Sequence, residues 1–204
     1  MSLDVNSPQK WEADYVGKSD GWDLAGPTPA LRRLAASGRF PPGRMMVPCA
    51  GRGHDAREFA RRGFDVTAVD FSAYAVREMK RLADPDAPLE IVQGDLFALP
   101  ASLDGAFDYV LQYTCFCAID PQRRTEYADV VARVLKPGGI YIDLAFPLDG
   151  RAGGPPFAVS EAGIVRLFEG RGFTLVGREK PSDSVAARRE AEALLVFRKA
   201  VPAN

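Results

Sequence analysis

Residues 45–56 read MMVPCAGRGHDA, and this stretch decides the fold class because an apolar run leads into a glycine-rich turn and then into a helix. Gly51 and Gly53 stand where the backbone must approach a ligand closely before it enters the helical segment 55–62. The spacing through Ala56 also matches the G-x-G-x-x-A pattern of dinucleotide-binding turns. The turn therefore predicts a nucleotide-containing cofactor and leaves two classes open, a nicotinamide dinucleotide and S-adenosylmethionine.

Strand-like and helical patterns alternate on both sides of this turn. We expect strands over 45–47, 64–69, 89–92, 107–113 and 140–146, and helices over 29–37, 55–62, 72–82, 121–135 and 160–171. Such alternation predicts a parallel sheet with right-handed crossovers. Strands 173–178 and 194–198 follow, and the short charged connection between them favours an antiparallel edge strand. The expected fold is an α/β, Rossmann-like three-layer sandwich with a mostly parallel seven-stranded sheet.

The chain has 204 residues and 47% hydrophobic content, which suffices for one substantial core. We therefore expect one domain over 1–204, with an N-terminal lid over 1–28 and a Rossmann-like core over 29–204. The lid segment is polar and carries isolated aromatic residues, Trp11, Tyr15 and Trp22. Residues of this kind in a polar segment favour a role in covering a ligand.

The charge balance excludes several classes of partner. The formal net charge is −1, from 26 basic and 27 acidic residues, so neither a nucleic-acid surface nor an anionic-membrane surface is expected. The pair Arg188-Arg189 is interpreted as a solvated helix face, because Glu190 and Glu192 follow directly. No apolar leader or long apolar run is visible, which predicts a cytoplasmic protein.

Three cysteines are present, Cys49, Cys115 and Cys117, and an odd count without framework spacing argues against a disulfide scaffold. Cys115 and Cys117 are two residues apart, so their side chains would point the same way on a strand. With His54 as the single histidine, we expect no metal site. His54 itself is expected to cap or hydrogen-bond locally within the turn.

Two acidic residues follow the next strands in order. Asp70 closes the second strand, where a carboxylate can accept hydrogen bonds from both ribose hydroxyls; the alternative is a helix N-cap. Asp95 follows the third strand and can accept from an adenine amino group, while Leu96 and Phe97 supply apolar contact to the ring. The alternative is an ordinary turn with a side-chain hydrogen bond. The adenine interpretation favours S-adenosylmethionine over a nicotinamide cofactor.

Several further stretches carry a resemblance. They are the runs DYV at 108–110, YTCFCAIDP at 113–121, LKPGG at 135–139 and GGPPF at 153–157, together with Trp22-Asp23, Pro27-Thr28-Pro29 and 47–55. Nearly the whole chain resembles the thiopurine methyltransferase superfamily, and most of all its halide/thiol (thiocyanate) branch. That family usually has a glycine and then a cysteine before Gly51, whereas this chain has Cys49-Ala50. Thiopurine-type members carry an arginine at the position of Tyr113, which favours the halide/thiol branch.

The resemblance implies an enzyme that transfers a methyl group from S-adenosylmethionine to a small soft nucleophile such as a thiol, thiocyanate or halide. Tyr113 is the candidate catalytic residue, and the candidate acceptor residues are Trp11, Trp22, Tyr113 and Phe116. The candidate cofactor residues are Trp22, Cys49, Gly51, Gly53, Asp55, Asp70, Phe71, Ser72, Asp95, Leu96, Phe97 and Gln112. Because the sulfonium donor is already activated and the acceptor is an anion, no strong general base is expected.

Two alternatives remain from the residues alone. An NAD(P)-dependent oxidoreductase would use the same glycine turn, but no Tyr-x-x-x-Lys set is present and the chain leaves little room for a substrate domain. A non-catalytic S-adenosylmethionine-binding protein would also satisfy the cofactor motifs. The expected partner is a small-molecule acceptor, and a monomer is favoured, although the sequence fixes neither the acceptor nor the oligomeric state.

Overall fold

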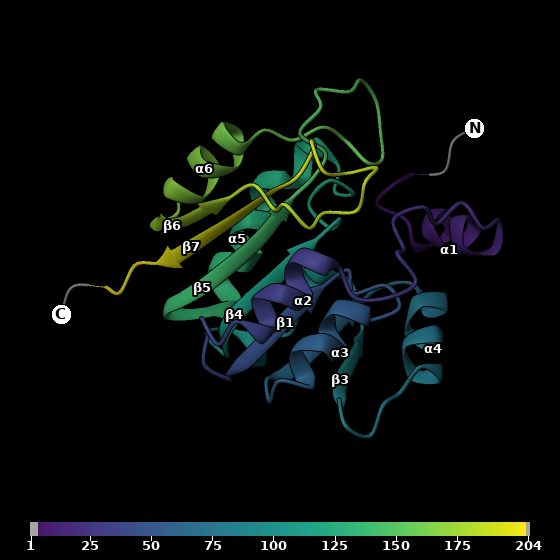
Figure 1. The fold of residues 1–204 in the computed structure, drawn as a ribbon, viewed down its shortest axis with the longest axis horizontal. Coiled ribbons are helices and arrows are strands. Elements are labelled where there is room, and N and C mark those ends of the chain that lie inside the picture. The colour runs from purple at the N-terminus through teal and green to yellow at the C-terminus, as the bar shows by residue number, and fades with distance from the viewer. Residues whose placement is uncertain (1–3, 203–204) are drawn as a thin grey trace.

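The computed structural model describes residues 4–202, and its centre is a twisted sheet of seven strands (Figure 1). Their order is β3 (Leu89–Gln93), β2 (Asp65–Asp70), β1 (Arg44–Pro48), β4 (Phe107–Tyr113), β5 (Leu135–Ala145), β7 (Ala193–Lys199) and β6 (Phe173–Glu179). All neighbouring pairs from β3 to β5 are parallel, and β7 runs antiparallel to both β5 and β6. The predicted seven-stranded, mostly parallel sheet with an antiparallel strand near its edge is confirmed.

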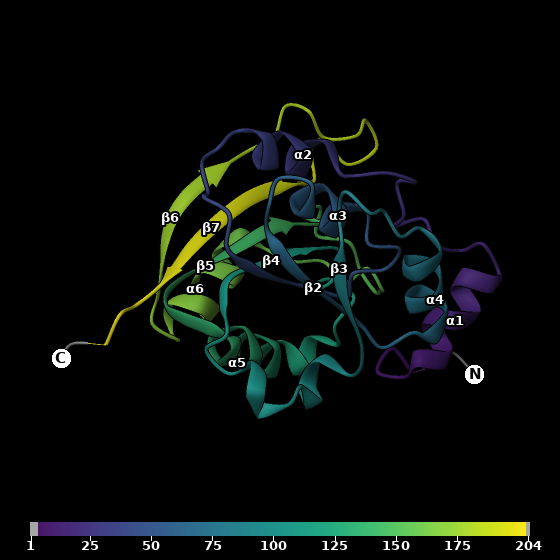
Figure 2. The ribbon, with the colours of Figure 1, turned by 90° about the horizontal axis from the view of Figure 1, so that it is seen from below.

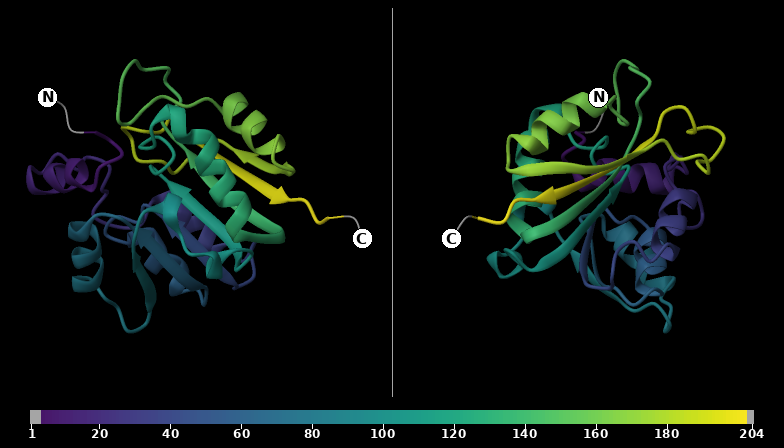
Figure 3. Two further views of the ribbon diagram at one scale, coloured as in Figure 1. Left: turned by 180° about the vertical axis from the view of Figure 1, so that it is seen from behind. Right: turned by 60° about the vertical axis from the view of Figure 1, so that its left-hand side comes forward.

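Helices cover both faces of the sheet, as Figure 2 shows. On one face lie α2 (Pro29–Ala36) and α3 (His54–Ala60), and on the other lie α5 (Arg124–Val134) and α6 (Glu161–Glu169). The helix α4 (Ala73–Arg81) packs against β2 and β3, and α1 (Pro8–Val16) packs against α4 at the periphery (Figure 3). Three short 3₁₀ turns complete the set, η1 (Leu96–Ala98), η2 (Ala101–Leu103) and η3 (Pro121–Arg123).

The central strands are mostly apolar because both of their faces are buried. On β1, Met45 and Val47 join the hydrophobic cluster under α2 and α3, whereas Met46 joins the cluster under α5 and α6. Successive side chains of a strand point to opposite faces, so this alternation builds both cores from one short run. The run MMV at 45–47 therefore specifies a central strand rather than an edge.

Local signals set most element boundaries where they were predicted. Ser72 caps α4, and its hydroxyl accepts a hydrogen bond from the Ala75 amide at 3.3 Å. The helix expected through Leu135 instead ends at Val134, and Leu135 already pairs with Phe107 of β4. The pairing register then shifts before Tyr109 meets Ile140, so the Lys136–Gly139 turn lies within β5.

The position of β1 and β4 at the centre of the sheet places the ligand-binding edge. The chain winds outward from β1 through β2 to β3 and then crosses back to β4 on the other side of β1. In open α/β sheets, ligands bind beyond the carboxyl ends of the strands at this switch point. The turns after β1 (residues 49–53) and after β4 (residues 114–120) therefore face each other across the expected cleft. Within residues 4–202, no helix combines the length and the apolar character needed to cross a membrane.

Candidate active site

A cavity of about 600 Å³ lies at the carboxyl ends of β1, β2 and β3. Its walls come from the strand ends, the N-terminal segment 5–22, the loop around 151–156 and the tail segment at 187–188. Eight predicted residues line it: Trp11, Trp22, Cys49, Asp70, Phe71, Asp95, Leu96 and Phe97. A smaller hollow of about 70 Å³ shares Trp22 and Cys49 with the cavity and adds the predicted residues Gly51, Asp55 and Tyr113. The volume of the larger cavity is typical of small-molecule sites.

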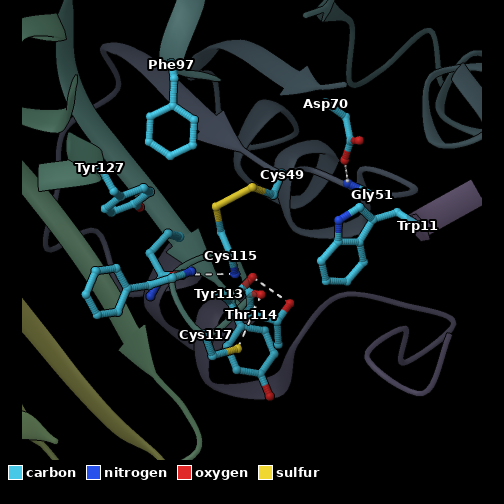
Figure 4. Close-up of a disulfide and its surroundings, with 12 residues drawn as sticks. Trp11, Cys49, Gly51, Asp70, Phe97, Tyr113, Thr114, Cys115, Cys117 and Tyr127 are labelled. Atoms are coloured by element: carbon cyan, nitrogen blue, oxygen red, sulfur yellow. Dashed lines mark hydrogen bonds between the residues drawn. A yellow bond between two sulfur atoms is a disulfide. The ribbon is translucent and has the colours of Figure 1, made fainter. Parts of the chain in front are cut away.

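The carboxylate of Asp70 joins the ends of β1 and β2. Its Oδ2 accepts a hydrogen bond from the Gly51 amide at 2.8 Å (Figure 4). Its Oδ1 accepts one from the Ser72 amide at 3.0 Å. Burial raises the pKa of this carboxyl to about 6, although the backbone hydrogen bonds act to lower it. Each carboxylate oxygen still has a second lone pair, so Asp70 can accept further hydrogen bonds from a ligand.

Gly51 adopts a left-handed conformation with φ of 55°. A Cβ placed there would lie 3.2 Å from the hydroxyl oxygen of Tyr15, a residue of α1. The glycine therefore serves two purposes, a backbone angle that other residues adopt at a cost and room for the tyrosine. Tyr15, which lines the cavity, was not among the predicted site residues. Its position in the polar segment 1–28 was the available signal.

The adenine-side candidates lie together on one wall. Asp95 caps η1, because its Oδ1 accepts a hydrogen bond from the Phe97 amide at 2.9 Å, and its other oxygen is left for a ligand. The ring of Phe97 lies under the guanidinium of Arg123, whose central carbon is 3.6 Å from the ring centroid. Asp95 therefore lines the cavity, as predicted, and also makes the side-chain hydrogen bond of an ordinary turn, which was the alternative interpretation.

Four of the predicted residues line neither the cavity nor the hollow. Gly53 directly precedes α3 with φ of 74°, and a Cβ there would lie 2.6 Å from the Met79 side chain of α4, so this glycine permits helix packing. Ser72 caps α4. Gln112 is buried and accepts hydrogen bonds from the Cys115 and Phe116 amides at 3.2 and 3.1 Å. These three residues support the helices and turns around the cavity but do not line it.

Phe116 is the fourth predicted residue that lines neither the cavity nor the hollow. It packs into the core beside Tyr127 of α5, with ring centroids 5.3 Å apart. Only 4% of its surface is exposed.

Asp55, in the smaller hollow, accepts hydrogen bonds from the Thr28 amide and hydroxyl at 2.7 and 2.9 Å. It therefore anchors the end of the N-terminal segment to α3.

An aromatic cluster holds the N-terminal segment over the cavity. Trp22 meets Trp11 and Tyr15 edge to face, with centroids 5.5 and 5.3 Å apart, and Tyr15 stacks on Tyr74 of α4 at 4.9 Å. Pairs of this geometry stabilise beyond their buried area. Both tryptophans line the cavity, as expected if the segment covers a ligand.

Charged contacts tie the same segment to the glycine turn. Arg52 pairs with Asp20 at 2.7 Å and also with Asp23. His54 begins α3, and its Nε2 lies 3.5 Å from Asp23, while burial lowers the pKa of its imidazole. The Nδ1 of His54 lies 3.4 Å from Arg57 Nη2 in the same helix, whereas its Nε2 has no hydrogen-bond partner among the described residues.

The Tyr113 hydroxyl lies in a buried network that the sequence interpretation missed. It donates a hydrogen bond to Glu192 Oε1 and accepts one from Arg188 Nη1 at 2.6 Å. Arg188 also donates to the carbonyl oxygens of Gly21 and Trp22 at 2.8 and 3.1 Å. The interpretation of Arg188 as part of a solvated helix face is wrong, since only 7% of its surface is exposed and it lines the cavity.

The cysteine count argued against a disulfide scaffold and did not indicate a single bridge, but one bridge is present. Cys49 and Cys115 are joined by a disulfide, with Cα atoms 5.4 Å apart (Figure 4). The pair follows from the sheet order, because β1 and β4 are neighbours and each cysteine follows its strand. Cys115 and Cys117 lie in a turn rather than on a strand. The Cys117 thiol contacts the Thr114 carbonyl at 3.4 Å, and burial raises its pKa to about 12.

Comparison with known proteins decides the family. The model of the family described as thiopurine S-methyltransferase matches residues 6–203. The chain belongs to this family. It is 34% identical over 201 residues to the probable thiol methyltransferase 2 of Arabidopsis thaliana, covering 97% of this chain and 88% of the relative. Thiocyanate methyltransferase 1 of the same plant is 30% identical over 193 residues, covering 93% and 84%.

A solved structure supports the fold. The 1,6-didemethyltoxoflavin-N1-methyltransferase of Burkholderia thailandensis, with bound 1,6-didemethyltoxoflavin and S-adenosylhomocysteine, matches with a TM-score of 0.69 at 20% identity, over 95% of this chain and 87% of that one. Family membership makes this chain an S-adenosylmethionine-dependent methyltransferase and decides against the nicotinamide alternative. The carboxylates of Asp70 and Asp95 in one cavity with the apolar Leu96 and Phe97 fit a nucleoside with ribose hydroxyls and an amino-bearing base.

Proposed function

We propose that the enzyme methylates a small soft nucleophile, a thiol, thiocyanate or halide. The relatives that match more than nine-tenths of the chain are named as thiol and thiocyanate methyltransferases. The observation that carries the proposal is the position of the Arg188 guanidinium, which lines the cavity 5.4 Å from the Tyr113 ring centroid and 5.1 Å from that of Phe146. A cation between aromatic rings suits a polarisable anion.

In this proposal the cofactor lies along the ends of β1, β2 and β3. Asp70 accepts from the ribose hydroxyls, Asp95 accepts from the adenine amino group, and Phe97 contacts the ring. When bound, S-adenosylmethionine supplies a methyl group that its sulfonium centre has already activated. Trp22, Cys49, Gly51 and Phe71 then border the cofactor, because they lie at the cavity or at the hollow beside it.

The protein's contribution is positioning and exclusion of water. Holding two reactants in line is worth about 7–11 kcal/mol in favourable intramolecular cases. The N-terminal segment, with Trp11 and Trp22 over the cavity, acts as the lid that closes on both ligands. Charge disperses as an anion meets a sulfonium, so a dry aromatic pocket favours the transition state over the ground state.

The test is a panel of iodide, thiocyanate, bisulfide and small thiols, assayed for release of S-adenosylhomocysteine. We expect turnover with at least one class of soft nucleophile and none with amine or hydroxyl acceptors of the same size. A rise in Tm with S-adenosylhomocysteine, without turnover of any acceptor, would instead identify a protein that binds the cofactor without catalysis.

A further inference from the structure

The hydrogen bonds of the Tyr113 hydroxyl leave one position open. A phenolic oxygen has one proton to donate and two lone pairs to accept with. The proton goes to Glu192, and one lone pair accepts from Arg188. The second lone pair has no partner among the hydrogen bonds of residues 4–202. The Arg188 guanidinium on this hydroxyl lines the cavity, and the Tyr113 ring lies 6.4 Å from the ring of Phe146, another cavity residue.

Glu192 also has an oxygen atom that is free to accept a hydrogen bond. Only 2% of its surface is exposed, and its Oε1 accepts the Tyr113 proton. Its Oε2 is buried without a hydrogen-bond partner among the residues that the structure describes. A buried carboxylate oxygen without a partner is costly, and it leaves Glu192 with lone pairs that are free to accept.

We infer that Glu192 takes up, through Tyr113, the proton of a thiol acceptor. This inference rests on the proposed function. As the acceptor sulfur forms its bond to the methyl carbon, the bond from that carbon to the cofactor sulfur breaks. The S–H proton moves to the Tyr113 oxygen while the phenolic proton moves to Glu192. The products are a neutral thioether, neutral S-adenosylhomocysteine and a protonated Glu192, which returns its proton to solvent after product release.

The surroundings favour a relay over a stable tyrosinate. Burial raises the pKa of the Tyr113 hydroxyl well above its usual value, and the nearby Glu192 raises it further. Tyr113 therefore stays neutral and passes a proton on at the moment it receives one. The 2.6 Å hydrogen bond from Arg188 fixes the direction of the hydroxyl, because Arg188 can only donate.

Two classes of acceptor differ in whether they must lose a proton during the reaction. Iodide and thiocyanate are fully ionised at neutral pH and have no proton to lose. An alkyl thiol with a pKa near 8.5 is only a few per cent thiolate at pH 7, so removal of its proton becomes part of its reaction. Glu192 should therefore matter for thiols of high pKa and much less for the halides and thiocyanate.

The experiment compares Glu192→Gln with wild type across iodide, thiocyanate, an aromatic thiol that is ionised at pH 7 and an alkyl thiol that is not. We expect kcat/KM for the alkyl thiol to fall about 100-fold, in the range of general acid–base contributions. The loss should shrink to less than about threefold for iodide. Tyr113→Phe should show the same dependence on acceptor pKa, because it removes the hydroxyl that relays the proton.

Glu190→Gln is the matched control, since Glu190 is exposed two residues away and pairs with Lys180. Tm and the affinity for S-adenosylhomocysteine are measured for every variant and should stay near wild type. Equal losses for iodide and alkyl thiol, or no loss for the alkyl thiol, would overturn the relay. If Glu192→Gln does not fold, Tyr113→Phe decides by the same comparison. Failure of wild type to methylate any acceptor would refute the proposed function itself.

Discussion

The proposed site has a cofactor half and an acceptor half, and the two are built in different ways. On the cofactor side, the carboxylates of Asp70 and Asp95 accept hydrogen bonds from nearby backbone amides. The donors lie two residues further along the chain, at Ser72 and Phe97, or in the glycine turn, at Gly51. On the acceptor side, Tyr113 depends on the side chains of Arg188 and Glu192, which lie 75 and 79 residues further along the chain. The cofactor half is thus set by the sheet itself, whereas the acceptor half exists only when distant segments come together.

The disulfide joins these two halves, because Cys49 belongs to the cofactor turn and Cys115 follows Tyr113's strand. The bridged residues are 66 positions apart. In the chain-entropy treatment, a closed loop of that size stabilises the fold by about 4 kcal/mol. We expect reduction with dithiothreitol to lower the free energy of unfolding by about this amount, measured by urea denaturation. This is the largest effect predicted here.

Cys115→Ala tests the assignment of that effect. The variant should be less stable than wild type without reductant and should not respond further to dithiothreitol. Cys117→Ala keeps the bridge and should retain the full response to reductant, whatever its own stability. A wild-type protein whose unfolding curve is the same with and without reductant would show that the bridge does not hold the two halves together.

Sequence patterns located most cofactor candidates at the cavity, because these residues occur in strand order between Gly51 and Phe97 and follow apolar runs. The strand and helix boundaries agree for the same reason, since short apolar runs and caps such as Ser72 act locally. The disulfide was missed because a cysteine count does not say which strands are neighbours. Pairing of β1 with β4 brings Cys49 to Cys115.

The acceptor half was predicted only in part. Tyr113 was proposed because it ends a central strand, whereas Arg188 and Glu192, which bond its hydroxyl, lie in a short charged connection that is typical of solvent-exposed loops. Arg188 is buried against the N-terminal segment, where Gly21 and Trp22 supply carbonyl oxygens, and Glu192 is buried beside Tyr113. The nearby Arg189 and Glu190 are exposed, so composition alone does not separate the two pairs. The lid residue Tyr15 was missed for a similar reason.

Arg188→Met sharpens the comparison by loosening the acceptor half alone. The variant loses two charged hydrogen bonds to the carbonyl oxygens of Gly21 and Trp22. We expect limited proteolysis within residues 17–24 to become at least about tenfold faster, the factor that corresponds to a loss of about 1.4 kcal/mol. Arg189→Met, which changes an exposed neighbour, should be cut at the wild-type rate. S-adenosylhomocysteine should protect wild type, and unchanged cutting of Arg188→Met would mean that Arg188 does not hold the lid.

The smallest predicted effect probes the cofactor half through pH. Burial raises the pKa of Asp70 to about 6, and the ribose hydroxyls need its ionised form as an acceptor. A ligand that binds the ionised form loses affinity as pH falls through that pKa, and affinity is fully present above it. Between pH 7 and pH 5.5, one such group weakens binding about fourfold. Calorimetry of S-adenosylhomocysteine binding should show this decline in wild type.

Asp70→Asn identifies the group responsible. It preserves the size of the side chain but has no proton to gain, so its weaker affinity should be flat between pH 5.5 and 7. Tyr15 contacts the same turn, but its raised pKa keeps it neutral throughout this range, and it adds no slope of its own. The acceptor-side variant Arg188→Met should retain the wild-type slope, because its change lies outside the cofactor turn. A slope that persists in Asp70→Asn would place the titrating group elsewhere and remove Asp70 as the pH-sensitive ribose acceptor.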